Sequence, residues 1–138
     1  MEIKRFDSLH PHAMTVRNTV FVEEQGFVDE FDDTDEIAIH LVMYDGDTPV
    51  GVCRVFRDKE ENAWLLGRFA ILREYRGKSN GSALLAMAEA VVRREGGRKI
   101  TLHAQCQASP FYQKNGYTPF GEIEYEQDCP HIAMRKEL

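Results

Sequence analysis

Cysteine is scarce in this chain of 138 residues, and what there is does not form a recognisable framework. Cys53, Cys106 and Cys129 are an odd number without a C-x-x-C pair, which argues against disulfides and against a zinc site. Because Cys53 and Cys106 lie in apolar, strand-like runs, we expect them to be small buried side chains. We therefore expect a reducing, cytoplasmic compartment and no metal ion.

Long hydrophobic runs and a surplus of basic charge are also missing. No apolar run approaches the ~20 residues of a membrane span, and the first residues, MEIKRF, do not resemble a signal peptide. The formal net charge is −6 at pH 7, from 17 Lys and Arg against 23 Asp and Glu. Since nucleic-acid-binding domains are usually basic, we expect neither nucleic acid nor a membrane as partner.

The composition that remains is that of a soluble, globular protein. Charged residues make up 29% of the chain and hydrophobic residues 43%, which argues against disorder. A chain of this length buries roughly two-thirds of the surface that it exposes when unfolded, which is enough for one core. No internal repeat or linker divides the sequence, so we expect one domain spanning residues 1–138.

Hydrophobic periodicity and turn residues predict elements in the order βα(α)βββαβαββ. The expected strands are residues 1–6, 37–44, 50–56, 64–71, 99–105, 117–125 and 131–136, with a charged connection at 57–62. The expected helices are residues 9–21, a helix from 82 to the Gly96-Gly97 pair, and 109–115. A right-handed crossover between strands 64–71 and 99–105 makes these two parallel neighbours. The predicted fold class is α/β, with a mixed, mostly antiparallel central sheet flanked by helices.

A strand, a turn of small residues and a helix N-terminus follow one another in residues 68–84. The first turn of a helix has N–H groups without intrahelical partners, and the helix dipole makes this end positive. Small residues let an anion approach these groups, and nearby cations add charge. The small residues are Gly77, Ser79 and Gly81, and the cations are Arg76 and Lys78. This pattern favours a phosphate or pyrophosphate ligand.

A second unusual stretch, residues 23–36, contains eight acidic residues among fourteen and no basic residue. One interpretation is a solvated, partly helical acidic face, which is what runs of charge usually form. The other is a rim that attracts a cationic substrate. Because Phe27, Val28 and Phe31 are interspersed with the acids, we expect this stretch to pack against the rest of the molecule.

These stretches resemble the GCN5-related N-acetyltransferases, the GNAT family, whose signature for acetyl-CoA is a strand, Arg/Gln-x-x-Gly-x-Gly/Ala and a helix. Here the signature reads Arg76-Gly-Lys-Ser-Asn-Gly81, with Ser79 in place of the first glycine. The stretch Phe111-Tyr-Gln-Lys-Asn-Gly-Tyr117 is similar to a late segment of the family. Val20-Phe-Val-Glu-Glu-Gln25 and Pro130-His-Ile-Ala-Met134 resemble the ElaA/YjcF-like branch. The resemblance covers essentially the whole chain and implies that the parallel strand pair is splayed.

The resemblance implies transfer of acetyl from acetyl-CoA, as co-substrate, to an amine. It places the pantetheine arm on the open edge of strand 64–71 and the pyrophosphate on the turn at 77–82. The implied cofactor-binding residues are Phe69, Ala70, Ile71, Arg76, Gly77, Lys78, Ser79, Asn80, Gly81 and Ser82.

The acceptor amine must lose a proton before it attacks, because an alkylamine with a pKa near ~10.4 is mostly protonated at neutral pH. Candidates for the base are Glu23, Glu24, His103 and His131, each of which could instead be a surface or structural side chain. The family commonly places a tyrosine acid where Tyr112 lies, although this ring could simply fill a gap. The expected catalytic residues are Tyr112, Glu24 and His103, and the expected substrate-binding residues are Glu23, Gln25 and His131.

The acceptor expected from these features is a cationic small molecule or a peptide amine, and the sequence does not choose between them. The alternative function is a non-catalytic module that binds or senses CoA or acyl-CoA. An interaction domain without a cofactor is a further rival. Members of the family are often dimers, so the resemblance also allows a homodimer.

Overall fold

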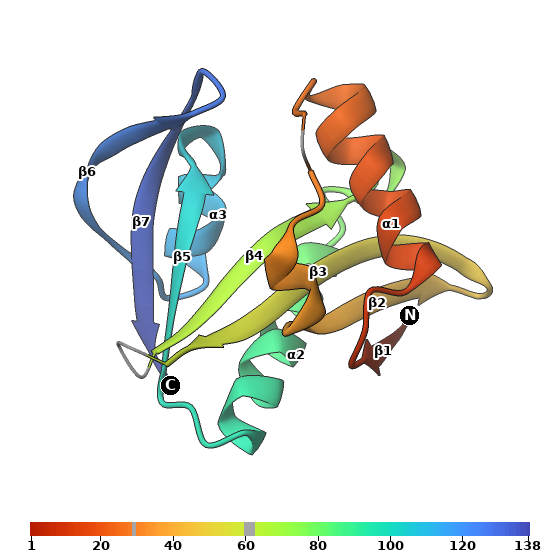
Figure 1. Cartoon of the computed structure of the whole chain (residues 1–138), viewed down its shortest axis with the longest axis horizontal. Helices are drawn as coiled ribbons and strands as arrows, with labels where there is room; N and C mark the ends of the chain where they lie inside the picture. Colours follow the sequence, from red (N-terminus) through yellow and green to blue (C-terminus); the bar gives the residue numbers. More distant parts are fainter. Residues whose placement is uncertain (29, 60–62) are drawn as a thin grey trace.

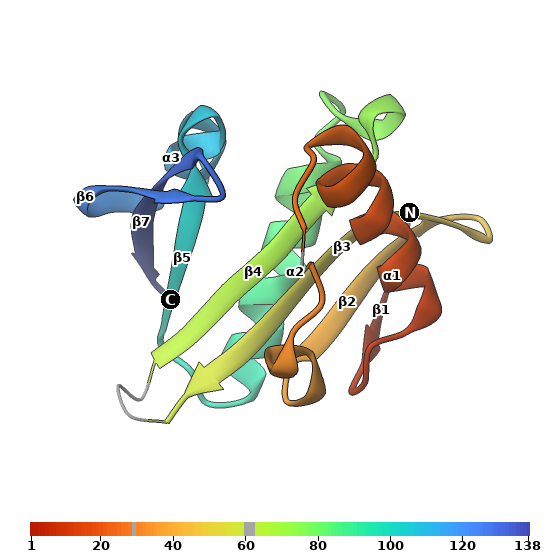
Figure 2. The same cartoon turned by 45° about the horizontal axis from the view of Figure 1, so that its top comes forward.

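Seven strands form one continuous sheet in this computed structural model, which describes residues 1–28, 30–59 and 63–138 (Figures 1 and 2). The sheet order is β1-β2-β3-β4-β5-β7-β6. The strands are β1 (Glu2–Phe6), β2 (Ile39–Asp45), β3 (Thr48–Asp58), β4 (Ala63–Ile71), β5 (Lys99–Gln105), β6 (Thr118–Glu126) and β7 (Cys129–Glu137). The helices are α1 (Pro11–Arg17), α2 (Asn80–Arg94) and α3 (Ser109–Lys114). Short helical turns are η1 (Asn18–Glu24), η2 (Asp33–Glu36), η3 (Arg73–Tyr75) and η4 (Cys106–Ala108).

The predicted fold class is confirmed. Every strand pair is antiparallel except β4 and β5, which are parallel and joined through α2. Helices α1 and α2 cover opposite faces of the sheet, so the alternating side chains of β3 enter two cores. Val52 packs in the α1 core, whereas Cys53 and Val55 pack in the α2 core.

Two expectations about local structure are wrong. The helix predicted at 9–21 ends at Arg17, and the chain continues as the π-helix η1, whose wide turns bury the adjacent residues Val20 and Phe21. Cys53 is buried as expected, but Cys106 begins η4 and is only half-buried. Of the expected charged connection at 57–62, residues 60–62 lie outside the described part of the chain.

A bulge in β4 opens the sheet beside β5. Between the pairs Val52↔Ala70 and Arg54↔Gly67, β4 has one residue more than β3, and Arg68 adopts a left-handed φ of 51°. A bulge bends its strand and increases the local twist. Pairing between β4 and β5 reaches only from Trp64↔Ile100 to Leu66↔Leu102, and the strands then diverge (Figure 2). The predicted splayed pair is therefore present.

No helix among residues 1–28, 30–59 and 63–138 is long and apolar enough to cross a membrane.

Candidate functional site

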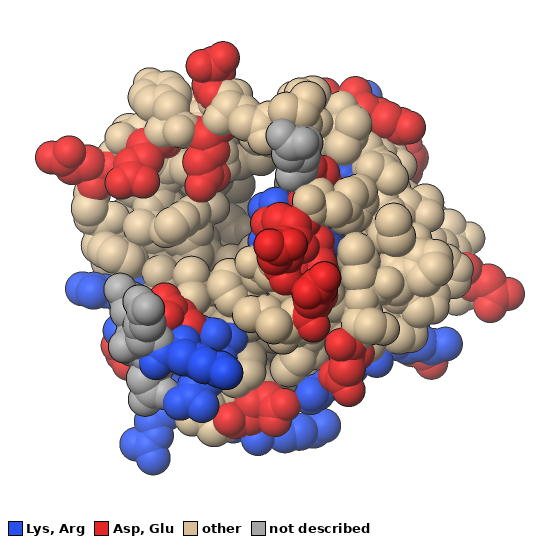
Figure 3. All heavy atoms as spheres, viewed as in Figure 1, with Lys and Arg blue, Asp and Glu red and all other residues tan. Residues whose placement is uncertain are grey.

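A cleft of about 670 Å³ occupies the space where β4 and β5 diverge. Residues 65–71 of β4 line one wall and residues 102–105 of β5 the other, and Phe111 and Tyr112 of α3 contribute aromatic surface. The space-filling view shows the molecule hollowed at this position (Figure 3). The open strand edges in this cleft carry backbone groups without a partner strand, which suits a ligand with amide groups of its own.

The turn between β4 and α2 is where the sequence predicts an anion-binding site. Gly77 has a φ of 74° and Ser79 a φ of 65°, so serine adopts here the left-handed conformation that glycine favours. The first turn of α2 contains no acidic residue, which leaves the positive end of the helix dipole uncompensated by its own side chains. A Cβ placed at Gly77 would meet nothing within 4 Å, so the space beside the turn is open to a ligand.

Arg76 and Glu24 form an ion pair beside this turn. Arg76 Nη1 and Nη2 lie 2.9 and 3.0 Å from the two Glu24 oxygens, and Arg76 Nε donates to the Ile71 carbonyl oxygen at 2.8 Å. The hydrogen bonds from Arg76 lower the pKa of the Glu24 carboxyl. This contact makes Glu24 a weaker base, and it ties η1 to the end of β4. Lys78 is exposed and leaves a second cation at the turn.

Tyr112 is a buried phenol that lines the cleft. Its ring packs against Phe69, Phe111 and Tyr117, with centroids 6.0, 5.0 and 5.9 Å away. Burial raises the pKa of Tyr112 above its ordinary value, with a smaller contribution from Cys53, so the hydroxyl keeps its proton at neutral pH. Its hydroxyl has no hydrogen-bond partner within the described residues. The side chain therefore packs as an aromatic filler and also keeps a protonated hydroxyl, so the donor role stays a prediction.

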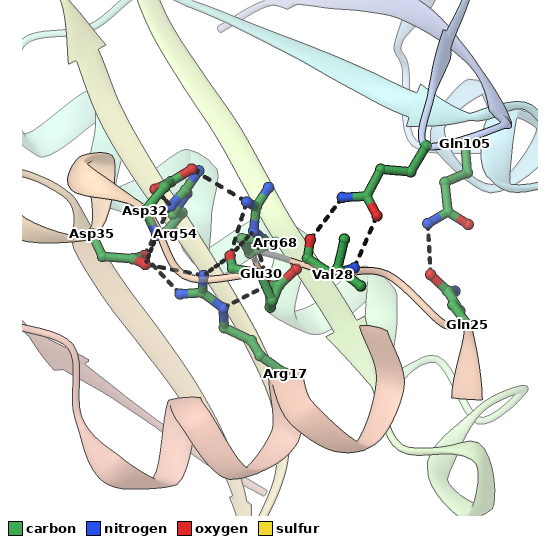
Figure 4. A network of polar contacts seen from close by, with 10 residues as sticks. Arg17, Gln25, Val28, Glu30, Asp32, Asp35, Arg54, Arg68 and Gln105 are labelled. Atoms are coloured by element: carbon green, nitrogen blue, oxygen red, sulfur yellow. Dashed lines mark hydrogen bonds and ion pairs between the residues drawn. The ribbon is translucent and has the colours of Figure 1, made fainter. Parts of the chain in front are cut away.

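The acidic stretch 23–36 is divided between exposed acids and acids that arginines bind: Glu23, Asp33 and Glu36 are exposed, whereas Glu30 and Asp35 are buried. Three of its acids are bound by arginines from α1, β3 and β4 in a network of six charged groups (Figure 4). The pairs are Arg17–Glu30 at 2.9 Å, Arg17–Asp35 at 2.7 Å, Arg54–Asp32 at 2.7 Å, Arg54–Asp35 at 2.9 Å, Arg68–Glu30 at 2.8 Å and Arg68–Asp32 at 3.2 Å. The first interpretation therefore holds for the exposed acids, whereas Glu30, Asp32 and Asp35 are bound by arginines, and Asp29 lies outside the described residues.

Burial and arginine contacts act in opposite directions on the carboxyl groups of this network. In Asp35, burial raises the pKa, but hydrogen bonds from Arg17 and Arg54 outweigh it and bring the pKa down to about 2. In Glu30, burial prevails over its arginine contacts and raises the pKa. Phe27 packs on Phe21 at 6.5 Å between ring centroids, as expected of a packed stretch.

Phe31 lies under the Arg17 guanidinium at 4.7 Å, which places a second apolar residue of the acidic stretch in packing contact. Val28 is 63% exposed, so the stretch packs through its two phenylalanines and not through this residue.

Three hydrogen bonds between amide groups connect the end of η1 and the residues after it to the opposite side of the cleft. Gln105 Nε2 donates to Gln25 Oε1 at 2.8 Å. Val28 N donates to Gln127 Oε1 at 2.9 Å, and Gln127 Nε2 donates to the Val28 carbonyl oxygen at 2.7 Å (Figure 4). The segment therefore connects to β5 and to the β6–β7 turn on the far side of the cleft.

The two predicted histidines lie on that far side, together with a carboxylate that the sequence reasoning did not select. His131 Nε2 is 3.0 Å from Glu126 Oε2, and His103 Nδ1 is 4.0 Å from Glu126 Oε1. All three line the cleft, whereas Glu23 is exposed and does not line it. Glu126 directly precedes the Gln127–Asp128 turn, and pairing of this hairpin could have indicated its position opposite Cys129.

An open strand edge and a buried phenol in one cleft, with a helix N-terminus next to it, are the arrangement expected of an acyl-transferring enzyme. Residues 9–138 match the acetyltransferase (GNAT) domain family. Bacillus subtilis YjcF, an uncharacterized N-acetyltransferase, is 35% identical over 91% of this chain and 90% of its own. The chain therefore belongs to the GNAT family of acetyltransferases.

Solved structures show the same fold. Escherichia coli ElaA superposes with a TM-score of 0.86 at 26% identity, and the match covers 99% of each chain. An aminoglycoside 6′-N-acetyltransferase complexed with coenzyme A has a TM-score of 0.75 at 19% identity, over 99% of this chain and 97% of its own. The resemblance to the ElaA/YjcF-like branch is therefore confirmed, and members of this fold bind coenzyme A.

Proposed function

We propose that this acetyltransferase moves the acetyl group of acetyl-CoA to a primary amine by direct attack in the cleft between β4 and β5. The observation that carries this proposal is a cleft lined by two of the expected features, with the third next to it. The strand edge opened by the bulge at Arg68 and the phenol of Tyr112 line the cleft, and Arg76, which also lines it, directly precedes the turn at the start of α2. The acceptor is a cationic small molecule or a peptide amine.

The residues around the cleft fit acetyl-CoA. The open edge of residues 69–71 would hold the amide groups of the pantetheine arm, as a neighbouring strand would. The N–H groups of residues 77–82 would hold the pyrophosphate, and exposed Lys78 adds a positive charge. Arg76 supports the turn through its contacts with Ile71 and Glu24. When bound, acetyl-CoA supplies a thioester, which is an acetyl group activated for attack by nitrogen.

Tyr112 would act as the acid of the reaction. Its raised pKa keeps the proton on its hydroxyl at neutral pH, so the hydroxyl would be available as a donor to the sulfur as negative charge develops there. No covalent bond between the protein and the acetyl group is required, so none of the three cysteines needs to be a nucleophile. The packing of three aromatic rings around Tyr112 holds the hydroxyl in place.

Of the four candidate bases, Glu24 and His103 were the two expected to be catalytic, and His103 is the better placed of these two. The side chain of His103 is 52% exposed and lines the cleft, and it lies on the wall opposite β4. Glu24 is occupied by Arg76, which makes its carboxylate less basic. We therefore propose that His103, directly or through water, takes the proton that the acceptor amine must lose.

Two measurements test the proposed function. Isothermal calorimetry with acetyl-CoA should show binding, and a thiol-release assay with a panel of primary amines should show turnover, with the acetylated product identified by mass spectrometry. Binding without release for every amine would favour the non-catalytic CoA-binding module. The absence of binding would overturn both proposals and favour an interaction domain.

A further inference from the structure

We propose that Glu126 binds the ammonium group of the acceptor and thereby selects protonated alkylamines; this inference rests on the proposed function. The first step is an elimination among the acids of the cleft. Within the described residues, the carboxylates that line the cleft are Glu30, Asp32 and Glu126. Arginines bind Glu30 and Asp32, whereas the charged neighbours of Glu126 are histidines. Glu126 is therefore the lining carboxylate that no described arginine neutralises.

One oxygen of Glu126 is available to a ligand. Oε2 is 3.0 Å from His131 Nε2, but Oε1 is 4.0 Å from His103 Nδ1, which is beyond hydrogen-bond distance. The Glu126 side chain is 53% exposed, so an incoming group can reach Oε1 from the cleft. A carboxylate that accepts from an ammonium group forms a charge-assisted hydrogen bond, which is stronger than a neutral one.

The position of Glu126 is held by rigid neighbours. His131 has a side chain only 9% exposed, and its Nδ1 lies 2.8 Å from the Cys129 carbonyl oxygen, which fixes the ring that contacts Glu126. Glu126 pairs with Cys129 across a two-residue turn, in which Gln127 and Asp128 have φ values of 49° and 65°. Two left-handed residues are typical of a tight hairpin turn, so the site lies on a defined scaffold.

An ammonium group on Glu126 would also lie beside the proposed base. His103 and Gln105 are two residues apart on β5, so their side chains lie on the same face of the sheet. His131 of β7 pairs with Gln105 in the sheet register. The amine can therefore pass one proton to a ring nitrogen of His103, which leaves a neutral amine with a free lone pair and a protonated imidazole. The charge balance is kept, because the positive charge moves from the amine to His103.

The test compares Glu126→Gln with Glu124→Gln, which removes the same charge from the same strand at an exposed residue that does not line the cleft. The acceptor is the alkylamine with the highest turnover in the panel, and a neutral arylamine is the second substrate. For the alkylamine, Glu126→Gln should raise KM so that kcat/KM falls about 10- to 100-fold. The kcat/KM of Glu124→Gln for the alkylamine should stay within about twofold of the wild-type value, because this side chain does not line the cleft.

Three further readouts decide the outcome. Glu126→Gln should leave the affinity for acetyl-CoA and the activity with the arylamine close to those of the wild type, and Glu126→Asp should recover part of the lost kcat/KM. Equal alkylamine kinetics in the wild type and Glu126→Gln would overturn the role of Glu126 and leave the proposed function intact. A wild type that acetylates no amine would overturn the proposed function, and the inference with it.

Discussion

Tyr112 is the residue at which packing and the proposed chemistry coincide. Its ring fills space between α3 and the sheet, and the same burial holds the proton on its hydroxyl. A phenol that keeps its proton is suited to donating to the departing sulfur and unsuited to acting as a base.

We expect Tyr112→Phe to lower kcat by about 10²- to 10⁴-fold, since it removes the proton donor and keeps the ring. The affinity for acetyl-CoA should change little, because the aromatic contacts remain. Steady-state kinetics and calorimetry measure the two quantities separately. Tyr125→Phe is the control, because Tyr125 is 72% exposed and does not line the cleft. Normal turnover in Tyr112→Phe would show that another group protonates the sulfur.

Asp35 makes the stability of the protein depend on pH. Its folded-state pKa of about 2 is below the ~3.9 of an unfolded aspartate, so the unfolded chain takes up the proton first as the pH falls. The resulting stabilisation is complete above about pH 5 and is lost as the pH falls towards 2; it amounts to about 2 kcal/mol. Urea unfolding of the wild type at pH 6 and pH 3 should therefore show a lower free energy of unfolding at pH 3.

The contribution of Asp35 can be isolated with two variants. Asp35→Asn should be less stable than the wild type at pH 6, because Arg17 and Arg54 lose a charged partner, and it should lose part of the pH dependence. Asp33→Asn should retain the pH dependence of the wild type, since Asp33 is exposed. If the free energy of unfolding has the same slope against pH in Asp35→Asn and in the wild type, Asp35 does not cause the pH dependence.

Local backbone geometry was predicted well, and contacts between separate elements were predicted poorly. The small-residue turn before α2 could be predicted because the turn and its helix are contiguous, whereas its role as an anion site stays a prediction. The pairing of Glu24 with Arg76 joins residues from separate elements, and no periodicity in either stretch indicates it. Glu126 was not selected although it is close to His131 in sequence, because the predicted strand ended at residue 125 and the register of the hairpin was not worked out.

At the scale of the element, the turn before α2 has Ser79 in place of the first signature glycine. The backbone nevertheless keeps the left-handed conformation that glycine favours there. Ser79 holds a φ of 65° and makes no capping hydrogen bond with its side chain. The left-handed conformation costs a residue with a Cβ roughly 1 kcal/mol relative to glycine, so this turn contains some strain.

Ser79→Gly should relieve that strain. We expect the free energy of unfolding to rise by up to about 1 kcal/mol and the affinity for acetyl-CoA to be kept or improved, because glycine adds clearance for the anion. Thermal unfolding and calorimetry with acetyl-CoA measure the two effects. Ser82→Gly is a useful comparison, since Gly inside the first turn of α2 should destabilise the helix. A Ser79→Gly protein that is less stable than the wild type would contradict this account.

The strands and the crossover helix were predicted closely because alternation and helical spacing report burial directly. Strand 99–105 agrees at both ends, and the other strands agree within a few residues. The π-helix η1 was not predicted, because hydrophobic residues were matched to the α-helical period of 3.6 residues and a π-helix has more residues per turn. The bulge at Arg68 was missed too, since a positive φ at arginine has no signature in the sequence.

At the scale of the whole molecule, the interpretation of the acidic stretch 23–36 depends on where the arginines lie in the folded chain. Arg17, Arg54 and Arg68 come from three elements and bind Glu30, Asp32 and Asp35, which neutralises the acids of the stretch that lie next to the cleft. The overall topology was predictable, but this neutralisation depends on contacts across as many as 38 positions, as between Arg68 and Glu30. The net charge of −6 is therefore a poor guide to the charge inside the cleft.

The short pairing of β4 with β5 has a consequence for the exchange of backbone hydrogens with solvent. Beyond Leu66↔Leu102 the two facing strand edges have no ladder between them, so cleft-facing amides of residues 67–71 and 103–105 should exchange deuterium rapidly in the free protein. Addition of acetyl-CoA should slow this exchange on β4, while the β2–β3 ladder stays unchanged as an internal reference. Mass spectrometry of the exchanged peptides would thus locate the bound cofactor arm along one strand without a crystal.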